Sequence, residues 1–265
     1  MTHDHNHLAE ILDLDAEVLH ELHREVIGWV AAQVPPDARI IDAGAGSGTA
    51  TLAFAEQLPG AEVTALDVEA EMLDRIQHKA RAAGLADRVR TIQADLDQPW
   101  PVLDAADLVW AAKSLHHMAD PAAAVARIFA VLRPGGLLAV TEAESFPRFL
   151  TDPAGEALEE RLHAALAQAR DDAGMHMHED WPARLTEAGF VVEAERRFDV
   201  ALRAPLPAQA PRYALLSLCH ARDGLAGRIS AEDLAELEAL GTAIPGRDDL
   251  TVRTSRMVWL ARRPG

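Results

Sequence analysis

The stretch Arg39-Ile-Ile-Asp-Ala-Gly-Ala-Gly-Ser-Gly-Thr-Ala50 carries the strongest indication of the fold. Its apolar start is typical of a buried strand, which ends at Asp42 and passes into glycines at positions 44, 46 and 48. Glycine permits a tight turn and a close approach of bare backbone to a ligand, and a helix opening after the turn directs its N-terminal amides at that ligand. The sequence therefore predicts a strand, a ligand-binding loop and a helix.

The glycine spacing, Asp-x-Gly-x-Gly-x-Gly, differs from the Gly-x-Gly-x-x-Gly of dinucleotide-binding loops. A pyrophosphate needs helix amides, whereas a ligand with an amino acid tail also needs a carboxylate for its ammonium group, which Asp42 can help to supply. In this form the stretch resembles the first motif of the class I S-adenosylmethionine-dependent methyltransferases. The resemblance implies that S-adenosyl-L-methionine is the cofactor and that the protein is a transferase acting on a methyl group.

Two later strand-like runs agree with the first motif, because each ends in an acid. The run Glu62–Asp67 ends 25 residues after Asp42, where an acid can accept the ribose hydroxyls of a nucleoside. The run Val89–Asp95 ends at Asp95-Leu96, the position at which similar enzymes contact the adenine ring. One such acid could merely cap the next helix. Three acids closing three successive strands make the resemblance specific.

A fourth run, Ala106–Ala111, leads into Lys113-Ser-Leu-His-His-Met118, and a fifth, Leu137–Glu142, follows a turn at Leu132-Arg-Pro-Gly-Gly136 that is common in the family. The ligands of open parallel sheets bind beyond the carboxyl ends of the strands. The loops after these runs are therefore expected to converge on one cleft. The resemblance implies that the cofactor contacts Asp42, Gly44, Ala45, Gly46, Asp67, Val68, Met72, Ala94, Asp95, Leu96 and Ala111.

Strands that alternate with helical stretches predict an α/β fold with a parallel, doubly wound sheet. The resemblance implies a Rossmann-like, seven-stranded sheet of order 3-2-1-4-5-7-6, in which only strand seven is antiparallel. The expected helices are 15–33, 69–83, 122–132, 155–172, 182–188, 212–221 and 231–240, and the expected late strands are 190–202 and 255–262. We expect one methyltransferase domain over 1–265, with the cofactor-binding core at 38–142 and a helical, substrate-side cap formed by 1–34, 145–181 and 205–246.

Composition narrows the possible partners. The chain has 265 residues, 49% of them hydrophobic, which suffices for a full core. It contains no apolar run of about 20 residues, no signal-peptide pattern and a single cysteine, so a cytoplasmic protein without disulfides is expected. The net charge of −17 argues against nucleic acid as a partner. The expected partner is a small-molecule substrate, without nucleic acid or membrane, and the expected state is a monomer or homodimer.

Catalysis of methyl transfer rests mainly on positioning, because the sulfonium already supplies the driving force. A base is needed only for a hydroxyl or a protonated amine, and histidine, with a pKa near ~6.5, suits that role. His116 and His117 follow the fourth strand and are the candidate catalytic residues, with His117 preferred because it closes the loop nearest the transferred methyl in similar enzymes. One of the two imidazoles could instead point into the core or cap the helix that starts near Pro121.

Five further residues are candidates for binding the acceptor. Among them, Tyr213 is the sole tyrosine, and a lone tyrosine is more often packed with its hydroxyl hydrogen-bonded. Arg148 is by itself more typical of a surface ion pair. The two histidines at positions 176 and 178 lack a further ligand in register, so no metal is expected. His3, His5 and His7 are interpreted as a disordered, weakly metal-binding tail. The candidate substrate-binding residues are Trp110, Arg148, His178, Trp181 and Tyr213.

Two other functions remain open at this point. An NAD(P)-dependent oxidoreductase shares the strand, glycine loop and helix, although the position of the third glycine and the acid at 95 argue against it. A protein that binds S-adenosylmethionine without transferring its methyl would carry the same binding motifs. The sequence leaves the acceptor, and the choice of oxygen, nitrogen, carbon or sulfur as the methylated atom, undetermined.

Overall fold

The computed structural model of the chain describes residues 2–144, 146–177 and 179–265, and the side chains in these ranges from residue 7 onward. The chain divides into two compact units. The sheet unit comprises Glu21–Glu142, His178–Phe198 and Met257–Gly265, and the helical unit comprises Met1–His20, Ala143–Met177 and Asp199–Arg256. Within the described ranges, no helix has the length and apolar character that a membrane span requires.

Seven strands form one sheet of order β3-β2-β1-β4-β5-β7-β6, as predicted. The pairs β2–β3, β1–β2, β1–β4 and β4–β5 are parallel. Strand β7 is antiparallel to β5: Gly135 bonds to Arg263, whereas the later Glu144 bonds to the earlier Ser255. The strands are β1 (Arg39–Ala43), β2 (Glu62–Asp67), β3 (Val89–Gln93), β4 (Ala106–Ala112), β5 (Leu132–Ala143), β6 (Val191–Leu202) and β7 (Val252–Arg262).

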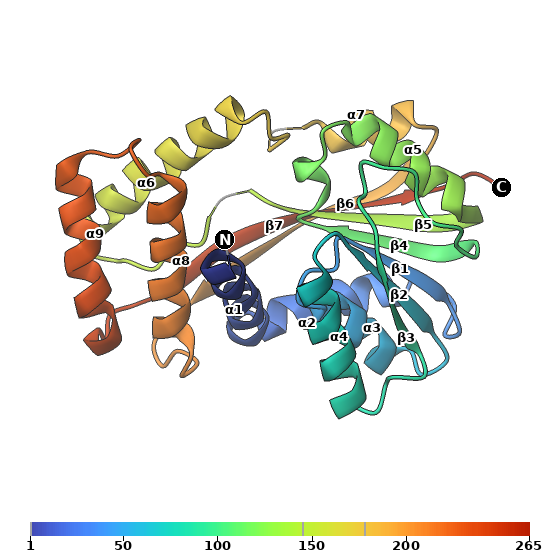
Figure 1. Cartoon of the computed structure of the whole chain (residues 1–265), viewed down its shortest axis with the longest axis horizontal. Coiled ribbons are helices and arrows are strands. Elements are labelled where there is room, and N and C mark those ends of the chain that lie inside the picture. The colour runs from blue at the N-terminus through green and yellow to red at the C-terminus, as the bar shows by residue number, and fades with distance from the viewer. Residues whose placement is uncertain (1, 145, 178) are drawn as a thin grey trace. The chain divides into compact units, whose positions relative to one another are not determined.

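Helices cover both faces of the strands in the sheet unit (Figure 1). On one face lie α3 (Thr49–Gln57) and α4 (Ala70–Ala82), and on the other lie α5 (Pro121–Val131) and α7 (Trp181–Glu187). The near-continuous apolar runs of β1 and β4 are buried because both faces are covered, as is typical of parallel sheets. The unit also contains most of α2 (His20–Ala31) and the short 3₁₀ helix η1 (Leu115–His117).

The third glycine of the loop after β1 is explained by packing. Gly48 has φ +85°, and a Cβ atom placed there would lie 2.5 Å from Cγ1 of Ile76 in α4. Only glycine lets α3 start this close to α4. The third glycine, which departs from the dinucleotide-type spacing, is therefore required by the close contact between α3 and α4.

The helical unit is built around α8 (Ala210–Gly224), which packs against α1 (Thr2–Val18), α6 (Pro153–Asp172) and α9 (Ala231–Ala243). A buried polar cluster joins three of its elements. The Tyr213 hydroxyl donates to Asp15 Oδ1 over 2.7 Å, and the Arg256 guanidinium donates to the same oxygen over 3.2 Å. The remaining short helix of the unit, η2, comprises Ile244–Gly246.

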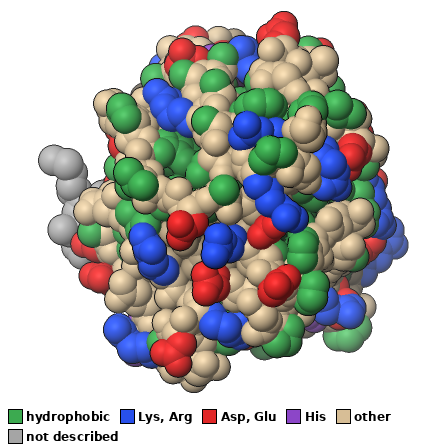
Figure 2. Space-filling view, turned by 90° about the vertical axis from the view of Figure 1, so that its right-hand side faces the viewer, with side chains coloured by type: hydrophobic (Ala, Val, Ile, Leu, Met, Phe, Trp, Pro, Cys, Tyr) green, Lys and Arg blue, Asp and Glu red, His purple; other side chains and the backbone are tan. Residues whose placement is uncertain are grey.

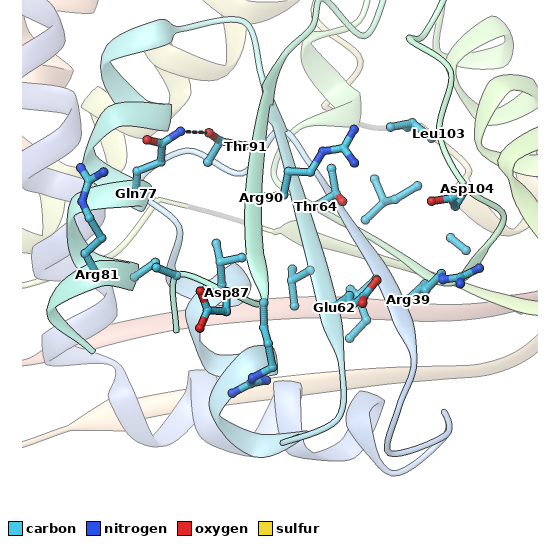
Figure 3. Close-up of a pocket in the computed structure, with 18 of the residues that line it drawn as sticks. Arg39, Glu62, Thr64, Gln77, Arg81, Asp87, Arg90, Thr91, Leu103 and Asp104 are labelled. Atoms are coloured by element: carbon cyan, nitrogen blue, oxygen red, sulfur yellow. Dashed lines mark hydrogen bonds between the residues drawn. The ribbon is translucent and has the colours of Figure 1, made fainter. Parts of the chain in front are cut away.

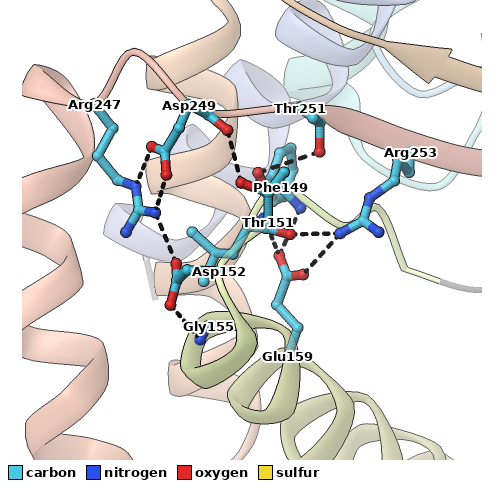
Figure 4. Close-up of polar contacts among 10 residues, drawn as sticks. Phe149, Thr151, Asp152, Gly155, Glu159, Arg247, Asp249, Thr251 and Arg253 are labelled. Atoms are coloured by element: carbon cyan, nitrogen blue, oxygen red, sulfur yellow. Dashed lines mark hydrogen bonds and ion pairs between the residues drawn. The ribbon is translucent and has the colours of Figure 1, made fainter.

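A second polar network holds the segment that follows β5 (Figure 4). Glu159 of α6 is fully buried and accepts the amides of Phe149 and Leu150. Burial raises the pKa of Glu159, an effect that these amide bonds and nearby arginines oppose. Arg247 joins Asp152, the N-cap of α6, to Asp249 (Figure 4). The network fixes the start of α6 to the chain on either side of it.

Three predictions about the elements are wrong. The helix predicted at 15–33 is two helices, because the chain turns at Leu19 between α1 and α2. The tail predicted to be disordered is helical from Thr2, since α1 buries Ala9, Leu14 and Val18 and packs against α8. The predicted turn at 132–136 belongs to β5, because its backbone bonds to Arg263 beside β7. The other predicted elements are present, with ends that differ by a few residues.

Candidate functional site

The loops that follow β1, β2 and β3 are bonded to one another at the carboxyl ends of the strands. The amides of Gly44 and Ala45 both donate to the carbonyl of Leu66 over 2.9 Å, and the amide of Ala94 donates to the carbonyl of Asp67 over 2.9 Å. These bonds lie within the sheet unit. The structure therefore brings the three predicted loops together.

Asp67 links two of these loops through its side chain. Its Oδ2 accepts the amide of Gly46 over 2.8 Å, and its Oδ1 accepts the amide of Glu69 over 2.9 Å. Each carboxylate oxygen can accept more than one hydrogen bond. Asp67 can therefore hold the loops in place and still accept bonds from ligand hydroxyls.

Asp42 is an enclosed carboxylate beneath the glycine loop. It is 2% exposed, and its Oδ2 accepts the hydroxyl of Thr51 over 2.6 Å. Burial raises the pKa of Asp42 to about 7; the Thr51 bond lowers it, and the charge of Asp67 adds to the rise. The ion pairs found among the described residues do not include Asp42. A cationic group of a ligand would therefore stabilise its ionised form.

Gly44 has a structural role that its sequence position does not reveal. It has φ +77°, and a Cβ atom there would lie 2.5 Å from Cβ of Ser114, which follows β4. The Ser114 hydroxyl donates to the carbonyl of Ala43 over 2.8 Å. Ser114 is thus a residue of the site that the sequence analysis missed, and only its place directly after β4 could have indicated it. It joins the fourth loop to the first.

The apolar residues predicted to contact the cofactor differ in exposure. Val68 is 54% exposed, whereas Met72, Leu96 and Ala111 are buried. Asp95 is exposed, and its Oδ1 accepts the amide of Asp97 in a local turn. Val68, Asp95 and Leu96 lie on the loops after β2 and β3, Met72 lies in α4, and Ala111 lies near the end of β4. These predicted cofactor residues therefore lie at the carboxyl ends of the strands.

The two candidate catalytic histidines lie in different environments. His116 is buried, and its Nδ1 lies 2.6 Å from Oε2 of Glu142 near the end of β5. His117 is exposed, and its ring centroid lies 4.1 Å from that of His116. Sequence spacing does not indicate this pair, because 26 residues separate His116 from Glu142.

A family model described as a methyltransferase domain matches residues 40–136, which include the glycine loop, β2 to β4 and the histidine loop. Residues 40–136 of the chain are therefore a methyltransferase domain. The predicted methyltransferase domain and the predicted fold are confirmed.

Curated relatives cover parts of the chain. A 27-O-demethylrifamycin SV methyltransferase from Amycolatopsis mediterranei (strain S699) is 30% identical over 186 residues, 69% of this chain and 65% of that protein. A trans-aconitate 2-methyltransferase from Azoarcus sp. (strain BH72) is 32% identical over 193 residues, 72% of this chain and 60% of that protein. A tRNA 5-carboxymethoxyuridine methyltransferase from Escherichia coli (strain K12) and an S-adenosyl-L-methionine-dependent Diels-Alderase from Talaromyces variabilis are 32% and 28% identical over shorter stretches.

The matches span 24% to 65% of the length of the first curated relatives. Among solved structures, one from Bacillus halodurans C-125 is similar to the chain with a TM-score of 0.59 and 20% identity, covering 91% of this chain and 98% of that one. This likeness concerns the fold alone.

Three of the residues predicted to bind the acceptor are buried. Trp110 is 3% exposed and packs edge-on against Phe54 of α3 at 5.4 Å. Trp181 is 2% exposed and belongs to the core between α7 and the sheet. Tyr213 is 1% exposed, and its hydroxyl is satisfied by Asp15. All three side chains are packed inside the protein, which sequence position alone could not reveal, and their role in binding the acceptor stays a prediction.

The other two residues predicted to bind the acceptor are Arg148 and His178. Arg148 forms an isolated antiparallel bridge with Arg253 in the helical unit. Burial, with a smaller effect from the Arg148 charge, lowers the pKa of the nearby His163 to about 4. His178 lies outside the described residues. In the described part of the chain, no group of three His, Cys, Asp or Glu side chains could hold a metal ion.

A cavity of about 660 Å³ lies in the methyltransferase domain away from the glycine loop. Figure 3 shows it at the amino-terminal ends of the strands, where Arg39 and Glu62 begin β1 and β2. Gln77 of α4 donates to the Thr91 hydroxyl at its margin (Figure 3). Because ligands of parallel sheets bind at the carboxyl ends, this cavity is not the cofactor site.

Proposed function

We propose that the protein transfers a methyl group from S-adenosylmethionine to a small-molecule acceptor. The observation that carries the proposal is the pair of carboxylates at the glycine loop, one enclosed at Asp42 and one bonded across two loops at Asp67. Asp42, with its raised pKa, suits a ligand ammonium group, and Asp67 suits the ribose hydroxyls. Val68 and Asp95-Leu96 then flank the adenine.

The reaction is an in-line displacement at the methyl carbon. The acceptor atom forms a bond to the methyl carbon while the carbon–sulfur bond breaks, and its electron pair stays on sulfur, leaving S-adenosylhomocysteine. Holding the three atoms collinear can contribute ~7–11 kcal/mol by proximity alone. If the acceptor is a hydroxyl or a protonated amine, its proton must pass to a base, and we propose that the His116–His117 pair supplies it.

Charge favours a small acceptor over nucleic acid. The net charge is −17, and on the face shown in Figure 2 basic side chains are interspersed with acidic ones. A nucleic acid substrate requires clustered Lys and Arg. Because the chain is similar to a tRNA-modifying enzyme, tRNA should be tested as an acceptor. When bulk tRNA is added to the reaction, we expect no methylated RNA.

The test begins with binding. Calorimetry should give binding of S-adenosylmethionine and S-adenosylhomocysteine and none of the reduced nicotinamides, whereas binding of a nicotinamide instead would return the oxidoreductase interpretation. Turnover is then followed with labelled S-adenosylmethionine and a small-molecule metabolite extract. We expect extract-dependent formation of S-adenosylhomocysteine and transfer of label to a small molecule.

A second function, binding of the cofactor without methyl transfer, is favoured by one finding, the similarity to a Diels-Alderase named as S-adenosylmethionine-dependent. The labelled experiment separates the two. Tight cofactor binding together with substrate conversion and unchanged S-adenosylmethionine would establish the second function and refute methyl transfer.

A further inference from the structure

Glu142 is a buried acid in the sheet unit, and the proposed methyl transfer assigns it no role. It lies near the end of β5, and its side chain is 9% exposed. Its Oε2 lies 2.6 Å from Nδ1 of His116, whose side chain is 7% exposed. Such a short contact between two enclosed ionisable groups is a specific pairing, because a salt bridge on a protein surface would exchange with water.

This contact determines which nitrogen of His116 can take a proton. When Glu142 is ionised it only accepts hydrogen bonds, and Nδ1 of His116 then carries the hydrogen. The lone pair of neutral His116 then resides on Nε2, the nitrogen that faces away from Glu142. A carboxylate that fixes the tautomer in this way also stabilises the imidazolium formed when Nε2 accepts a proton.

The second oxygen of Glu142 is also buried. Oε1 is enclosed and has no hydrogen-bond partner among the described residues. Leaving a buried polar atom unpaired costs about 1–3 kcal/mol. Such atoms are few in folded proteins and often accompany a functional requirement. A glutamate placed only for packing would not need this arrangement.

We propose that Glu142 is the positioning residue that makes His116, rather than His117, the general base. This inference rests on the proposed methyl transfer. His117 is exposed and stacks beside the His116 ring, where it can shape the loop. In the step, the acceptor's X–H proton passes to Nε2 of His116 as the X–CH₃ bond forms, and the imidazolium later releases that proton to water.

The first test reads the tautomer and needs no acceptor. In ¹⁵N NMR of the full chain, His116 should show a protonated Nδ1 and an unprotonated Nε2 at pH 8. Glu142→Gln should abolish this preference, because an amide can also donate to Nδ1, and Glu142→Asp should retain a carboxylate and part of the preference. Glu159→Gln is the matched control and should leave the His116 signal unchanged, since it changes another buried glutamate in which one oxygen has no hydrogen-bond partner.

The second test uses turnover. Glu142→Gln should lower kcat by up to about 10²–10⁴, the range of a general base, with the Kd of S-adenosylmethionine within about twofold of wild type. His116→Ala should lower kcat by as much as Glu142→Gln does, and the double variant should lower kcat by little more than either single variant. A wild-type tautomer in Glu142→Gln, or a larger loss in His117→Ala than in His116→Ala, would overturn the proposal. Absence of wild-type turnover with every acceptor would instead refute the proposed function, while the NMR result still decides the pairing.

Discussion

Cofactor binding should depend on pH through Asp42. Burial raises the pKa of this carboxyl to about 7, and a bound ammonium group would lower it again. Binding at a pH below 7 therefore releases a proton, so the affinity must fall as the pH falls. For a pKa of 7, the ionised fraction drops from about 0.76 at pH 7.5 to about 0.09 at pH 6.0, which corresponds to about an eightfold weaker Kd, or about 1.2 kcal/mol.

The assay is calorimetry at pH 6.0 and 7.5, each in two buffers of different ionisation enthalpy. We expect the release of nearly one proton per cofactor at pH 6.0 and about a quarter of that at pH 7.5. Asp42→Asn should bind more weakly at pH 7.5 and should lose the pH dependence. An affinity that is constant over this range, or a dependence that persists in Asp42→Asn, would show that Asp42 does not meet the ammonium group.

The same carboxyl should lower the stability of the cofactor-free protein. The folded-state pKa of Asp42 lies above the unfolded value of ~3.9, so burying this carboxyl destabilises the folded state once the group ionises in the unfolded chain. The folded protein therefore loses stability as the pH rises from about 4 through 7. The loss is at most about 4 kcal/mol, from about three pKa units at 1.36 kcal/mol each. Asp42→Asn should therefore raise the melting temperature at pH 7.5, and this increase should become smaller as the pH is lowered. An unchanged or lower melting temperature would contradict the burial cost.

Three further outcomes are expected. Asp67→Ala should weaken S-adenosylmethionine binding about ten- to a hundredfold in calorimetry, since it leaves ribose hydroxyls and loop amides unpaired; a change below twofold would place the ribose elsewhere. Gly48→Ala should lower the unfolding free energy by ~1–3 kcal/mol more than Gly84→Ala, because both have positive φ but only position 48 meets a neighbour within 3 Å; equal losses would remove the packing explanation. Tyr213→Phe should reduce stability by ~1–3 kcal/mol by removing a bond to buried Asp15 and leave the acceptor KM unchanged, whereas an altered KM with unchanged stability would support the predicted acceptor role.

Local chemistry explains what could be predicted about the cofactor loops. A run of apolar residues, an acid and a glycine turn act over a few residues, so the strands ending near Asp42, Asp67 and Asp95 could be read directly. Parallel order then places their carboxyl ends at one edge, and the structure bonds those loops together. The acceptor side could not be read in this way, because Trp110 and Trp181 are large residues that fit a core as well as a pocket.

The sequence by itself determined the sheet order, the cofactor family and the loop that bears the histidines, because each follows from residues close together in the chain and from the resemblance they carry. Only the tertiary structure decided that Gly44 passes over Ser114, that Gly48 admits Ile76, and that His116 rather than His117 meets Glu142. These pairs are brought within contact by the packing of separate elements. The physical reason is that packing distance and burial, which set both steric fit and the environment of a charge, belong to the folded chain and have no counterpart in residue spacing.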